Sequence, residues 1–128
     1  MTTDLWMLAA AALLTWILIM ADATPGILNN GIGWASGNRD VTPDPEGLHG
    51  RLHRASENMK ENLPLFAVLV LVVHVAGEAD PTSAIGAQVF VCARVLHAIV
   101  YAVGVPWLRT AVWGVSIVGM GMVASAML

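Results

Sequence analysis

Four long apolar stretches alternate with shorter polar ones along this chain. The first begins near Leu5 and runs without a charged residue to Ala21, and the later three cover about residues 63–77, 82–103 and 106–127. Apolar segments of about 20 residues with few charges are typical of transmembrane helices. The pattern therefore predicts four helices that cross a membrane.

The polar and apolar positions together set the expected helix bounds. We expect helices at about residues 4–34, 46–77, 82–103 and 106–127, all within one domain of residues 1–128. Pro25 and Pro64 fall inside the first two helices, where proline removes a backbone donor and favours a kink. The expected fold class is an all-α integral membrane protein, a bundle of four transmembrane helices.

Composition agrees with this class and excludes others. Of the 128 residues, 57% are hydrophobic and 12% are charged, which is more apolar than an ordinary soluble domain. The net charge is −3 and no basic run is present, so we expect no nucleic-acid partner. The single cysteine, Cys92, excludes an internal disulfide.

The basic residues are placed unevenly, and their placement predicts the topology. They lie in or near the first and third connections, or in helices that open onto them, whereas both ends of the chain carry none. By the positive-inside rule, we expect both termini to face outward and the polar half of the second helix to face the cytoplasm. The six basic residues are Arg39, Arg51, Arg54, Lys60, Arg94 and Arg109.

A polar stripe marks the first half of the second expected helix. Arg51, Arg54, Asn58 and Glu61 are separated by three, four and three positions, so they share one helical face. Arg54 and Glu61 are about 10 Å apart along such a helix, which is the length of a small polar ligand. Charges at a membrane boundary are costly unless they are paired, solvated or used. This stripe is a candidate binding surface.

The third helix carries a second polar stripe. Arg94, His97 and Tyr101 are three and four positions apart, and Arg109 follows at the same side of the membrane. Groups from both stripes can therefore meet between the helices and bind a ligand. The alternative is a structural ion-pair network, for example between Glu61 and Arg94, that holds the bundle together.

Other polar and small residues carry weaker signals. His49 and His53 have the four-residue spacing used in metal sites, but among nearby residues only Glu46 offers a further ligand, so we expect no metal. Gly121 and Ser125 form a small-xxx-small pair that either lets helices approach closely or is ordinary membrane-helix composition. Tryptophans near segment ends are interpreted as interface anchors: Trp6, Trp34, Trp107 and Trp113.

The two stripes together resemble the MAPEG family, the membrane-associated proteins in eicosanoid and glutathione metabolism. The resemblance rests on RLHRASENMKENLPLF at residues 51–66 and on ARVLHAIVYAVGVPWLRT at residues 93–110. Both blocks occur in the family's order with similar separation, and the four-segment layout covers nearly the whole chain. The Asn62-Leu63-Pro64 variant is similar to the bacterial branch of the family.

The resemblance implies a homotrimer that binds glutathione between neighbouring subunits near the cytoplasmic side. It implies that Arg109 stabilises the glutathione thiolate and that Thr110 lies where some members place a hydroxyl residue. Six further positions match family residues that hold the tripeptide or line its site. They are Arg54, Asn58, Glu61, Arg94, His97 and Tyr101.

By this resemblance, the protein is a membrane-bound glutathione transferase or peroxidase of a bacterial inner membrane, acting on lipophilic substrates. One departure from the family is the lack of a basic residue between Pro25 and Asn30, where active members usually have an arginine late in the first helix. A different thiol is therefore also considered. The alternative from another class is a non-enzymatic membrane protein whose polar stripe binds a lipid headgroup or is a structural network.

Overall fold

The computed structural model describes residues 1–128 and contains only helices and their connections. The four long helices are each long and apolar enough to cross a membrane, so the predicted fold class of an all-α, four-helix membrane protein is confirmed. One further helix, α2, is short and has only five residues. The helices are α1 (Thr3–Asn30), α2 (Ile32–Ser36), α3 (Gly47–Ala76), α4 (Pro81–Val103) and α5 (Pro106–Ser125).

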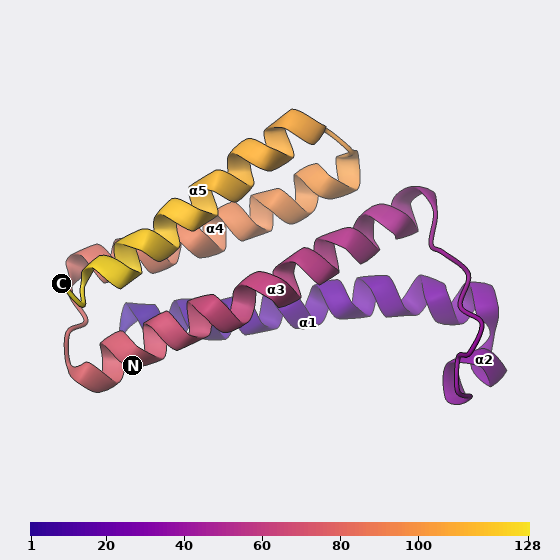
Figure 1. Cartoon of the computed structure of the whole chain (residues 1–128), viewed down its shortest axis with the longest axis horizontal. Coiled ribbons are helices and arrows are strands. Elements are labelled where there is room, and N and C mark those ends of the chain that lie inside the picture. Colours follow the sequence, from indigo (N-terminus) through magenta and orange to yellow (C-terminus); the bar gives the residue numbers. More distant parts are fainter.

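The long helices form two neighbouring pairs, α1 with α3 and α4 with α5 (Figure 1). Helix α4 also packs against α1 and α3, so it joins the two pairs into one bundle. Both chain termini lie at the end of the molecule that holds the α3–α4 turn (Figure 1). Helix α2 and the loop that follows it lie at the opposite end, together with the start of α3.

Glycines and an acidic cap fix where the helices end. The expected helix of residues 4–34 is divided in the structure, because Gly31 adopts a φ of 86° that ends α1 and starts α2. Asp80 caps α4 through a reciprocal capping box with Ser83. Gly104, also at a φ of 86°, ends α4 beside Arg51, whose Nε donates to the Ala102 carbonyl at 2.9 Å. This bond ties the start of α3 to the end of α4.

Apolar packing fills the middle of the bundle. The rings of Phe66 from α3 and Phe90 from α4 are stacked, with centroids 4.0 Å apart. Met59, Val70 and Val123 are fully buried around them. Large apolar side chains on the outer faces of the helices are exposed, as a lipid environment requires; on α3 they are Leu48, Leu65, Val68, Leu71, Val72 and Val75.

Helices α4 and α5 approach each other closely at two glycines. A Cβ atom at Gly119 would lie 2.7 Å from the carbonyl oxygen of Gly86 and 2.7 Å from the backbone nitrogen of Phe90. The small residues at this crossing therefore allow backbone contact. Gly121, considered from the sequence as part of a small-residue pair, instead faces open space, with nothing within 4 Å of its would-be Cβ.

We predict that Gly119→Ala destabilises the protein while Gly121→Ala does not. The methyl group that Gly119→Ala introduces would meet backbone atoms, which can move only with their helix. Overpacking of this kind costs about 1–3 kcal/mol. Thermal unfolding in detergent, followed by circular dichroism, compares the two variants. Equal melting temperatures for Gly119→Ala and the parent would show that α4 and α5 can separate enough to accommodate the added methyl group.

Candidate functional site

Residues of three helices line a small, open polar cavity near the turn that joins α4 to α5. Its volume is about 150 Å³. Six residues line it. Five of them have polar or charged groups and belong to the two sequence blocks that resemble the MAPEG family, and the sixth is a tryptophan. They are Asn58 of α3, His97 and Tyr101 of α4, and Arg109, Thr110 and Trp113 of α5.

Helix periodicity and a tight turn bring these residues together. His97 and Tyr101 are four positions apart on α4, and Arg109 and Trp113 are four apart on α5, so each pair lies on one helical face. Only Gly104 and Val105 separate the two helices. Because the chain reverses over two residues, the last turns of α4 lie beside the first turns of α5.

Aromatic contacts position the one cationic group that lines the cavity. The Cζ atom of Arg109 lies 4.6 Å from the ring centroid of Tyr101. A guanidinium over an aromatic face is attracted by the ring quadrupole. His97 packs edge-on against the same ring, with centroids 5.4 Å apart. Tyr101 thus supports both basic residues of the cavity wall.

Arg94 lies behind this wall, almost completely buried between α3 and α4. Its Nη2 donates to Asn58 Oδ1 at 2.8 Å, and its Nε donates to the Met59 sulfur at 3.3 Å. Its Nη1 is buried and makes no hydrogen bond within the chain. The structural alternative of a Glu61–Arg94 ion pair is wrong, because the amide of Asn58 takes the place of that carboxylate.

The remaining two predicted binding residues stand apart from the cavity. Arg54 and Glu61 are exposed on α3 and line no part of it. Their spacing still places them on the same face of α3 as Asn58. Within one chain, the structure therefore joins Asn58, Arg94, His97, Tyr101 and Arg109, and it leaves Arg54 and Glu61 on the neighbouring surface.

The sequence pattern did not predict the places of two residues in these polar clusters. Trp113 was interpreted as an interface anchor, although its place four residues after Arg109 already puts it on the same face. Asp22, on α1, contacts both His49 and His53. Asp22 is remote from both histidines in sequence, so only the packing of α1 on α3 brings its carboxylate to them.

The fold and its exposed apolar faces define an integral membrane protein of four spanning helices, with a lipid bilayer as its surroundings. The family model of the MAPEG family matches residues 3–128, essentially the whole chain. The chain therefore belongs to the MAPEG family. No curated protein and no solved structure gives a significant match. Family membership supports, in general terms, a glutathione-related transferase, peroxidase or related function at a membrane.

We predict that Asn58→Ala lowers stability and that Asn58→Asp does not lower it to the same extent. Removing the amide leaves the buried Arg94 guanidinium without its oxygen acceptor, which costs about 1–3 kcal/mol. Aspartate restores an acceptor at the same position. The melting temperatures of both variants in detergent test this, and an Asn58→Ala protein that melts like the parent would contradict it.

Proposed function

We propose that the protein is a membrane-bound thiol transferase or peroxidase that uses glutathione, or another small thiol, against lipophilic electrophiles or hydroperoxides. The observation that carries the proposal is the Arg109 guanidinium in the wall of a small cavity, held over Tyr101 and beside His97. In this role Arg109 acts on the thiol, and Asn58, His97 and Tyr101 bind around it.

Stabilising a thiolate is the chemistry that this cavity suits. The thiolate rather than the thiol is the nucleophile, and a free thiol has a pKa of about 8.5, so at neutral pH most of it is protonated. A guanidinium close to the sulfur favours the charged form, and it does so more strongly where little water screens the pair. Arg109 would thus raise the thiolate fraction and its reactivity.

The cavity suits the sulfur end of a thiol better than a whole tripeptide. Its volume of about 150 Å³ is well below the range of about 300–1,000 Å³ that encloses a drug-sized ligand. The rest of glutathione would extend along the exposed stripe of Arg54 and Glu61. Two carboxylates and one ammonium group are complementary to arginines and one glutamate.

A homotrimer is part of the proposal, because it would cover this stripe. Arg54 and Glu61 form no ion pair within the chain, and a neighbouring subunit would enclose a ligand bound along them. We further propose that the protein lies in a bacterial inner membrane with both termini outward and the cavity toward the cytoplasm. Both termini lie at the end opposite α2 (Figure 1), as that topology requires.

The proposal includes thiols other than glutathione because α1 lacks one basic group. From Pro25 to Asn30 the helix carries no cation. Arg39 is the next arginine along the chain, and its guanidinium donates hydrogen bonds to the Ala35 carbonyl and stacks on Trp34. A ligand with fewer carboxylates than glutathione would need one basic partner fewer.

We predict that glutathione added to the purified protein at neutral pH produces a saturable thiolate absorbance band and that Arg109→Ala abolishes it. Arg109→Lys, which keeps a cation of different shape, is expected to retain part of the band. Lys60→Ala is the matched control, because Lys60 pairs with Glu57 outside the cavity. Ultraviolet difference spectroscopy in detergent provides the measurement, and a full band in Arg109→Ala would refute the proposed role of Arg109.

The second candidate is a non-enzymatic role in which the polar residues bind a lipid headgroup or only stabilise the bundle. The buried Arg94–Asn58 contact favours it, since that hydrogen bond joins two helices without any ligand. Arg54→Ala separates the candidates. A lower melting temperature with no effect of glutathione on parent or variant supports the structural role, whereas unchanged melting with loss of glutathione binding supports the thiol site.

A further inference from the structure

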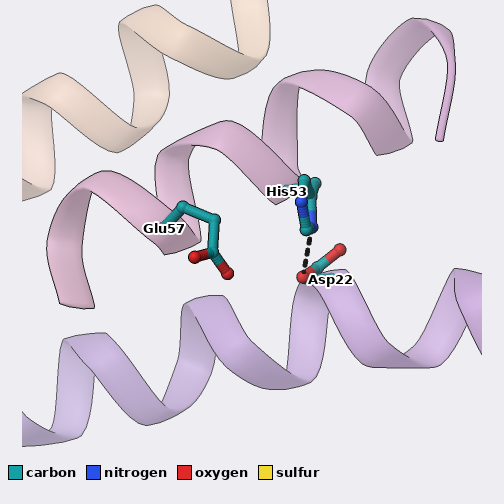
Figure 2. A group of neighbouring side chains, drawn as sticks. All are labelled: Asp22, His53 and Glu57. Atoms are coloured by element: carbon teal, nitrogen blue, oxygen red, sulfur yellow. Dashed lines mark hydrogen bonds and ion pairs between the residues drawn. The ribbon is translucent and has the colours of Figure 1, made fainter. Parts of the chain in front are cut away.

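A second polar cluster lies on the face of α3 that packs on α1. His49, His53 and Glu57 follow one another at four-residue spacing, so they form a stripe along the helix. Asp22 of α1 reaches this stripe from the facing helix (Figure 2). None of these four residues lines the thiol cavity.

Asp22 links the stripe to α1 through both of its carboxylate oxygens. His53 Nδ1 lies 2.9 Å from Asp22 Oδ2, and His49 Nε2 lies 3.1 Å from Asp22 Oδ1. His49 Nε2 also lies 2.9 Å from the Asp22 backbone carbonyl oxygen. A ring N–H of His49 donating to both oxygens fixes the orientation of the carboxylate, as groups around metal ligands commonly do.

The ligand atoms of Asp22, His53 and Glu57 lie near one another. One atom from each lies within 4.8 Å of those from the other two, and the carboxylate of Glu57 points toward α1 beside the other two (Figure 2). Atoms bound at about 2.1 Å around a tetrahedral ion are separated by roughly 3.4 Å. Glu57 is exposed and paired only with Lys60, so no buried contact fixes its carboxylate away from the other two ligands.

We propose that Asp22, His53 and Glu57 bind a divalent transition-metal ion, with Zn²⁺ the ion that suits them best, and that His49 positions Asp22. Two carboxylates neutralise the charge of the ion, and an imidazole ligand favours Zn²⁺ over Mg²⁺ or Ca²⁺. Three protein ligands leave a coordination position for water or a further ligand.

The surroundings provide room for that further ligand. Asp22, His49 and His53 also line a cavity of about 290 Å³ at the end of the bundle that holds α2. Its other walls include Trp34 and Arg39. An ion held by Asp22 and His53 would therefore lie beside a space large enough for water or a small anion, and it would tie α1 to α3.

The competing explanation is an ion pair in which the histidines bind Asp22 and no metal takes part. Zn²⁺ titration of the full chain distinguishes the two, using detergent-solubilised protein stripped with a chelator and purified without a histidine tag. Competition with a chromogenic chelator measures the affinity. We expect one Zn²⁺ per chain, a loss of at least about tenfold in affinity for Asp22→Asn and His53→Ala, and a smaller loss for His49→Ala.

Two further variants keep the test decisive. Glu57→Gln changes an exposed side chain, so weaker Zn²⁺ binding in this variant cannot be attributed to misfolding. His74→Ala is the matched control, because His74 lies exposed on α3 away from the cluster, and it should bind like the parent. Zn²⁺ should also raise the melting temperature of the parent and of His74→Ala, but not that of Glu57→Gln.

Three results would overturn the Zn²⁺ site, and none depends on whether the thiol proposal is correct. Absence of stoichiometric Zn²⁺ binding, or equal affinity in the parent, Glu57→Gln and His53→Ala, would overturn the metal site and leave the ion pair. Equal weakening by His74→Ala would show dispersed surface binding and would overturn it as well. Arg109→Ala should bind Zn²⁺ normally whether or not it forms a thiolate.

Discussion

The polar half of this protein depends on how one buried guanidinium is accommodated between two membrane helices. Arg94 is almost fully enclosed, and a cation at such depth is costly unless the protein supplies partners. Asn58 and Met59 supply them from α3. This requirement sets the register of α3 against α4, and that register in turn places Asn58 at the edge of the cavity formed by His97, Tyr101 and Arg109.

The apolar half holds together for a different reason. Lipid chains are as apolar as the side chains that they contact, so burial in a bilayer offers little drive for helices to associate, and close packing has to replace it. The Gly86–Gly119 crossing provides that packing between α4 and α5, and the Phe66–Phe90 stack provides it between α3 and α4. Helix α3 therefore presents three distinct surfaces: a polar one to the α4–α5 turn, an acid–histidine one to α1, and an apolar one to lipid.

The sequence predicted the features that depend on periodicity along one helix. Segment hydropathy gave the four spans, and residue spacing put His97 with Tyr101 and Asn58 with its stripe. It could not give features that depend on how helices face each other. Arg94 bonds Asn58 instead of forming the Glu61–Arg94 pair considered from the sequence. Asp22 contacts His49 and His53 from the facing helix α1. Gly31 divides the first expected helix through its positive φ. Hydrophobic periodicity does not reveal a single positive φ, so the sequence pattern did not predict this break.

Tyr101 is the only tyrosine in the chain, and it forms part of the cavity wall with a guanidinium 4.6 Å above its ring. The indole of Trp113 lines the same cavity, but the chain has five tryptophans and only one phenol. The single phenol is thus an intrinsic optical label at the polar cavity. Events at that location can be followed through its ultraviolet absorbance without chemical modification.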